Sequence, residues 1–159
     1  MKSHLIAGIV KSFLSGLFGI FLLQLQAQES ENFSSPAISP FIELGGKGWM
    51  SMNVDFRLKE TFAFSLGIAG IEEGWAPNIM GYYFGGKRSR LEIGGGLSTN
   101  FNAGEFYNMF IHGVIGYRYQ KKKGLLFRAG FTPMFVIPLT EEVKSAVIPW
   151  AGISLGYSF

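Results

Sequence analysis

The chain contains no cysteine among its 159 residues, and its two histidines are His4 and His112. The missing thiols exclude disulfides, a lipid anchor on cysteine and thiol catalysis. One histidine beyond the first residues, with acids scattered along the chain, does not make a transition-metal site, so we expect no metal and no cofactor. Charged residues are only 16% of the sequence, fewer than the roughly 25% of a typical soluble domain.

Long apolar runs are also missing after the first residues. At the start, the basic residues Lys2 and Lys11 precede an apolar stretch at 13–23. Ala27 then provides a small residue at a plausible cleavage point. This layout predicts a signal peptide at 1–27. A membrane anchor is the alternative, but the apolar stretch is shorter than the ~20 residues that a spanning helix needs. We expect a short periplasmic segment at 28–37 and one domain at 38–159.

What the sequence does contain is strict alternation, clearest in its last residues. Apolar Ile153, Leu155, Tyr157 and Phe159 alternate with Gly and Ser at 152, 154, 156 and 158. Such a period gives a strand with one apolar face. In an outer-membrane barrel the last strand pairs with the first and shows this face to lipid. The pattern resembles the terminal signal that the barrel-assembly machinery recognises, and we expect that machinery as a partner.

Alternation along the chain, the terminal strand included, predicts eight strands, most of them near the ~9–11 residues that a tilted strand needs to cross a bilayer. Helices are excluded because Gly recurs inside nearly every segment and the apolar residues do not follow a period of about 3.6. The predicted fold is all-β, an eight-stranded antiparallel up-and-down transmembrane β-barrel. Its strands are predicted at residues 38–46, 49–58, 61–71, 78–86, 89–99, 106–120, 124–137 and 147–159.

The charged residues within these strands share the polar face. On the lipid face at mid-depth, an Arg or Lys costs about 2–4 kcal/mol, so we assign the apolar face to lipid and the charges to the lumen. A soluble barrel with an apolar core is the alternative, but its outer face would then be Gly and Ser rather than Lys and Glu. The predicted lumen network comprises Glu43, Asp55, Arg57, Glu92, Arg118 and Arg128.

Three acids and three bases form a nearly neutral set, which predicts a plugged lumen. Counting from the proposed turns places all six in the periplasmic half of their strands. Small polar residues such as Ser51, Asn53 and Thr132 then line the outer half, which predicts a shallow pocket that opens outward.

The connections alternate in character along the chain. Those at 58–61, 85–89 and 120–124 are short and basic, and the loops at 72–77, 99–105 and 138–146 are longer and more acidic. Outer-membrane barrels place short turns in the periplasm and long loops outside. We therefore expect the three loops to meet an extracellular ligand or protein, which the sequence does not identify.

With these features the chain resembles the small eight-stranded outer-membrane barrels of the OmpA-transmembrane-domain and OmpX type. More narrowly, the segments 116–120, 127–133 and 149–159 resemble uncharacterised outer-membrane proteins of the Bacteroidota. The resemblance implies the bacterial cell outer membrane as location and outer-membrane lipid as surroundings. It implies no substrate.

Residues that carry chemistry are few. His112 stands at one of the alternate positions of its strand that face the lumen, and the sequence shows no evident catalytic partners for it. Lys121, Lys122 and Lys123 could attract phosphate, but they are typical of a solvated turn, and we expect no nucleic acid as partner. We predict a non-enzymatic structural or surface-interaction role. The alternative is a narrow pore for passive transport of small solutes, and an envelope lipid-modifying enzyme is favoured least.

Overall fold

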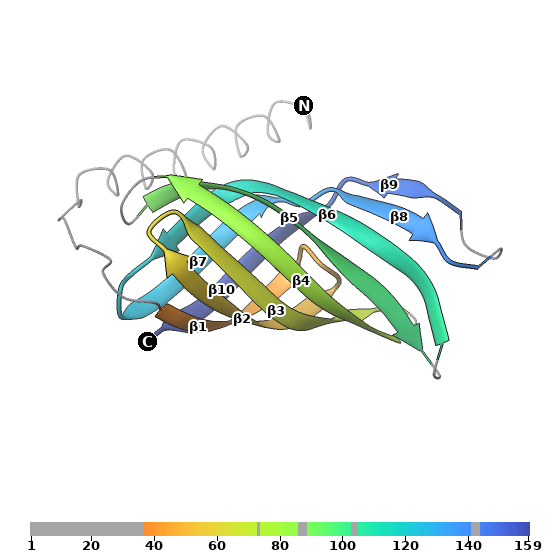
Figure 1. Ribbon diagram of the computed structural model, residues 1–159, viewed down its shortest axis with the longest axis horizontal. Coiled ribbons are helices and arrows are strands. Elements are labelled where there is room, and N and C mark those ends of the chain that lie inside the picture. The colour runs from red at the N-terminus through yellow and green to blue at the C-terminus, as the bar shows by residue number, and fades with distance from the viewer. Residues whose placement is uncertain (1–36, 73, 86–88, 103–104, 141–143) are drawn as a thin grey trace, which may run out of the picture. The chain divides into compact units, whose positions relative to one another are not determined.

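The computed structural model describes residues 37–72, 74–85, 89–102, 105–140 and 144–159. The predicted signal peptide at 1–27, and the segment 28–37 except Ala37, lie outside these residues. Within the described ranges the chain forms ten strands (Figure 1). They are β1 (Ala37–Gly45), β2 (Met50–Lys59), β3 (Phe62–Ile71), β4 (Gly74–Gly85), β5 (Ser89–Asn102), β6 (Glu105–Gln120), β7 (Gly124–Phe131), β8 (Met134–Pro138), β9 (Ala146–Ile148) and β10 (Ala151–Ser158).

The strands close into an antiparallel barrel. Each strand from β1 to β6 pairs with the next, β6 pairs with β7, β7 with β10, and β10 returns to β1. The strands β7 and β8 lie one after the other along β6, so they act as one interrupted strand. The strands β9 and β10 act as a second interrupted strand, because β9 pairs with β8 and β10 pairs with β7. The wall therefore has eight positions, and the predicted eight-stranded antiparallel barrel is confirmed.

Two predicted strands are interrupted by proline. The segment predicted at 124–137 divides into β7 and β8 at Pro133, and the one at 147–159 divides into β9 and β10 at Pro149. Proline has no N–H and cannot donate to a strand ladder. Backbone bonds bridge the gaps, since Gly113 N–H donates to Pro133 O at 2.9 Å and Thr132 N–H donates to Trp150 O at 2.7 Å.

The expected loop at 72–77 is wrong, because β4 already begins at Gly74. Pro77 is part of this strand and lies opposite Ile68 of β3. On the other side of β4, Trp75 and Asn78 pair with β5, and the pairing skips Pro77 between them. The missing N–H of Pro77 thus falls on the β5 side. The expected loop at 99–105 is also shorter than predicted, since β5 continues to Asn102 and β6 begins at Glu105.

The antiparallel order gives the barrel two distinct ends (Figure 1). We call the end where β1 begins and β10 ends the terminal end. The connections β2–β3, β4–β5 and β6–β7 lie there, and the connections β1–β2, β3–β4, β5–β6 and β8–β9 lie at the opposite, distal end. In the described ranges no helix is both long and apolar enough to cross a membrane.

The β1–β2 turn at the distal end is folded inward. Gly45 and Gly46 have φ values of 72° and 74°, a left-handed conformation that favours glycine. A Cβ on Gly46 would lie 2.6 Å from the Glu43 carboxyl carbon. The turn buries Lys47 to 3% exposure, which is unusual because most connections run over the surface.

Candidate functional site in the barrel interior

The barrel wall is apolar outside and polar inside. On β5 and β6, outward-facing Leu91 is 79% exposed and inward-facing Arg118 is 0% exposed. A water-soluble protein buries these residue types in the reverse order. Charged groups held away from water need partners, so the arrangement of the interior side chains defines the candidate site.

The centre of the lumen holds a chain of four charged side chains from four strands. Arg118 on β6 forms ion pairs with Asp55 on β2 and, at 2.9 Å, with Glu92 on β5. Arg128 on β7 donates to the other oxygen of Glu92 from Nε at 2.9 Å and from Nη2 at 2.6 Å. Glu92 thus joins two guanidinium groups, and Arg118 joins two carboxylates, as the planar fork of arginine allows. We call these four residues the central cluster.

Aromatic rings from β4 lie beside the central cluster. The Arg128 guanidinium carbon is 4.1 Å from the ring centre of Tyr82, and that of Arg118 is 4.6 Å from the ring centre of Phe84. Both rings are almost completely buried. A guanidinium over an aromatic face is favourable, more so when desolvated. The rings therefore fill the lumen and stabilise its cations together.

Arg57 also faces the lumen and lies nearer the terminal end than the central cluster. Its Nη2 donates to Glu60 O at 2.7 Å and its Nε to Lys59 O at 3.2 Å. Arg90 on β5 also donates to Glu60 O. The two guanidinium groups thereby satisfy backbone carbonyls of the β2–β3 turn.

Glu43 lies elsewhere than expected. It stands two residues before the end of β1 and forms an ion pair with Lys47 of the β1–β2 turn. Ser51 and Ser154 donate to its carboxylate at 3.3 and 3.2 Å. The prediction that Glu43 lies at the same end of the barrel as the other five charged residues is therefore wrong: β1 runs from the terminal to the distal end, and Glu43 is near the distal end of that strand.

The expected outward pocket is not formed by the residues predicted to line it. Ser51, Asn53 and Thr132 are each at most 5% exposed. Thr132 shares with Glu43 and Arg128 a cavity of only about 10 Å³, which is the room of about one water molecule. The inward-folded β1–β2 turn occupies the space that the sequence appeared to leave open.

His112 and Ser98 form a close pair within the lumen. His112 Nε2 lies 2.6 Å from Ser98 Oγ, and both residues are nearly fully buried. A serine nucleophile also needs a group that orients the histidine through its other nitrogen. In the described part of the chain, Nδ1 of His112 has no hydrogen-bond partner, and no group of three or more metal-ligating side chains occurs there.

The terminal-strand residues lie on the outer face. Ile153, Leu155 and Tyr157 of β10 and Phe159, which directly follows that strand, are all exposed. The strand β10 pairs with β1 on one side and with β7 on the other. Closure of the barrel therefore depends on this strand.

Several interior residues were not found from the sequence. Arg90 shares the parity of Glu92, which could have identified it, but it stands next to a predicted turn. Tyr82 and Phe84 are inward-facing because β4 presents alternate residues from Asn78 onward. Lys47 carried no signal, since a lysine in a turn is usually solvated.

No protein-family model matches the sequence, and no curated protein matches it. Among solved structures, the chain is similar to the crystal structure of the N-terminal beta-barrel domain of Pseudomonas aeruginosa OprF, with 16% identity and a TM-score of 0.48. The similar region covers 78% of this chain and 96% of that domain.

Proposed function

We propose that this protein is a non-enzymatic barrel of the bacterial outer membrane, with a plugged lumen and a structural or surface-interaction role. The observation that carries the proposal is the contrast between an exposed apolar outer face and buried interior charges. A closed barrel satisfies every wall strand by pairing, which is a requirement for strands in lipid. An apolar outer face is favourable in contact with lipid and unfavourable in contact with water, so we infer that lipid surrounds the barrel.

The lumen supports the plugged form over the alternative, a narrow pore. An eight-stranded barrel has an interior only about wide enough for its own side chains. Here the central cluster reaches across the lumen from β2, β5, β6 and β7, and Tyr82 and Phe84 pack against it. These contacts leave little room for a solute.

We expect the protein to give no sustained conductance in a planar lipid bilayer. A solute or hydrated ion would have to separate Arg118 from Asp55 and Glu92, and these charges are completely or almost completely buried. The measurement is single-channel recording after reconstitution at several protein concentrations. Steady, protein-dependent channels would favour the pore and contradict the plug.

Orientation is a second testable part of the proposal. The chain has no cysteine, so Lys144→Cys at the distal end and Lys122→Cys at the terminal end give matched single labels. Both positions are exposed. We expect an impermeant maleimide to label Lys144→Cys on intact cells, and Lys122→Cys only after the outer membrane is opened. The reverse pattern would invert the topology.

A further inference from the structure

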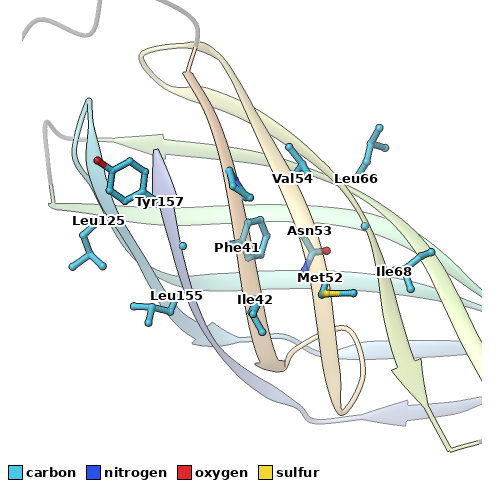
Figure 2. A pocket seen from close by; sticks show the side chains of 13 residues that line it. Phe41, Ile42, Met52, Asn53, Val54, Leu66, Ile68, Leu125, Leu155 and Tyr157 are labelled. Atoms are coloured by element: carbon cyan, nitrogen blue, oxygen red, sulfur yellow. The ribbon is translucent and has the colours of Figure 1, made fainter. Parts of the chain in front are cut away.

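The outer face of the barrel carries an apolar groove that the lumen does not explain. It has a volume of about 910 Å³ and crosses five neighbouring strands, β7, β10, β1, β2 and β3. Figure 2 shows it from close by, with Leu125, Leu155 and Tyr157 toward one side and Leu66 and Ile68 toward the other. At a strand spacing of about 4.8 Å, four intervals make it roughly 19 Å long.

Two rows of outward-facing side chains form the walls. In one row Ile42 lies opposite both Leu155 and Met52, and Met52 lies opposite Ile68. In the other row, Pro40 lies opposite Val54 and Val54 opposite Leu66, while Tyr157 lies opposite Leu125.

Between the rows, the floor is the strand backbone, with Gly156 and Gly67 among its residues. Pro40 and Val54 are short side chains in the middle of their row, so that wall is lower there and the groove is wider. An open apolar groove of this length accommodates an extended hydrocarbon chain along the wall.

One end of the groove meets a cationic turn. Leu125 lines the groove and follows Lys123 by two residues. Lys121 N–H donates to Leu125 O at 3.1 Å, which fixes the β6–β7 turn to the groove end. Lys121, Lys122 and Lys123 are all exposed at the terminal end of the barrel. Their positive charge lies where the headgroup of a chain bound in the groove would emerge.

We propose that this groove and turn together bind an anionic phospholipid, with an acyl chain between the two rows and the phosphate at the lysines. The inference rests on the proposed function, since it requires the terminal end to face the periplasmic leaflet. Each basic residue close to a membrane surface attracts anionic lipid by about fivefold in affinity. The groove adds a fixed place for the chain, so the preference is local to this part of the wall.

Quenching by brominated lipids tests the proposal on the membrane-purified protein. The reporter is Phe127→Trp, because Phe127 lies opposite Leu155 beside the groove. The native Trp49, Trp75 and Trp150 are replaced by Phe to remove their signal. Brominated phosphatidylglycerol or brominated phosphatidylcholine is then titrated into phosphatidylcholine vesicles. We expect at least about a tenfold preference for the anionic lipid, which falls as salt screens the charges.

Matched variants separate the local site from general attraction. Lys122→Gln with Lys123→Gln should reduce the preference to below about threefold. Lys59→Gln with Lys144→Gln removes the same charge from exposed positions away from the groove end and should leave it unchanged. Val54→Phe fills the groove and should also abolish the preference, whereas Val147→Phe, on the exposed face of β9, should not. Heat-modifiable gel mobility verifies that each variant is folded.

Two results would overturn the inference, and they differ from failure of the proposed function. Equal quenching by both lipids in the parent protein would refute the lipid site while leaving the barrel in the membrane. Equal losses in the two double-lysine variants would show that the attraction is not local. Absence of quenching by either lipid would instead contradict the membrane location, and the lipid site with it.

Discussion

Replacing Glu92 with glutamine is expected to lower the free energy of unfolding by about 3–5 kcal/mol. Glu92 accepts hydrogen bonds from both Arg118 and Arg128, and all three side chains are at most 5% exposed. Glutamine keeps the volume but removes the charge, so two buried guanidinium groups lose a shared anion. Arg128 is affected most, because its ion pair in the central cluster is with Glu92. Urea unfolding in phospholipid vesicles, followed by tryptophan fluorescence, measures the change.

Glu72→Gln is the matched control, since Glu72 is exposed in the β3–β4 turn. Loss of one exposed carboxylate there should change stability by less than about 1 kcal/mol. A Glu92→Gln protein as stable as the Glu72→Gln protein would show that the central cluster does not hold the lumen closed. The same preparation, tested for conductance, also reports whether the weakened cluster admits ions.

The fold could be predicted because one physical rule acts along the whole chain. Lipid outside and side chains inside impose a period of two on every wall strand, and that period is visible from Met50 to Leu58 and again from Ile153 to Phe159. The interruptions at Pro133 and Pro149 were not predicted. Alternation continues through them, and only the backbone pairing shows that the ladder is broken.

The interior site could be predicted in part. Parity assigns a residue to the lumen, which is why Glu92, Arg118 and Arg128 were found, but parity does not give its depth or its partner. Depth depends on strand direction and on how the turns fold. Glu43 therefore stands near the distal end and pairs with Lys47, a residue that the turn carries inward. Tyr82 lies within the strand predicted at 78–86, but tyrosine is also typical of the membrane interface, so its residue type did not assign it to the lumen.

An arginine on the lipid face should be the second change with a large effect. Leu66 stands near the middle of β3, is 45% exposed and faces outward between Val54 and Ile79. An Arg or Lys at the bilayer midplane costs about 2–4 kcal/mol. We expect Leu66→Arg to lose that stability in vesicles and to slow the appearance of the compact, heat-modifiable band during folding.

The matched control is Leu58→Arg, at the terminal end of β2. Leu58 is 54% exposed on the same outer face but adjoins Lys59 and the β2–β3 turn. An arginine near the membrane interface costs only about 0–1 kcal/mol, because its side chain reaches the headgroups. The difference between the two variants therefore measures depth in lipid rather than the tolerance of the fold for arginine. In a water-soluble barrel both leucines would face solvent, and both variants would then be as stable as the parent. That result would contradict the membrane location of the barrel.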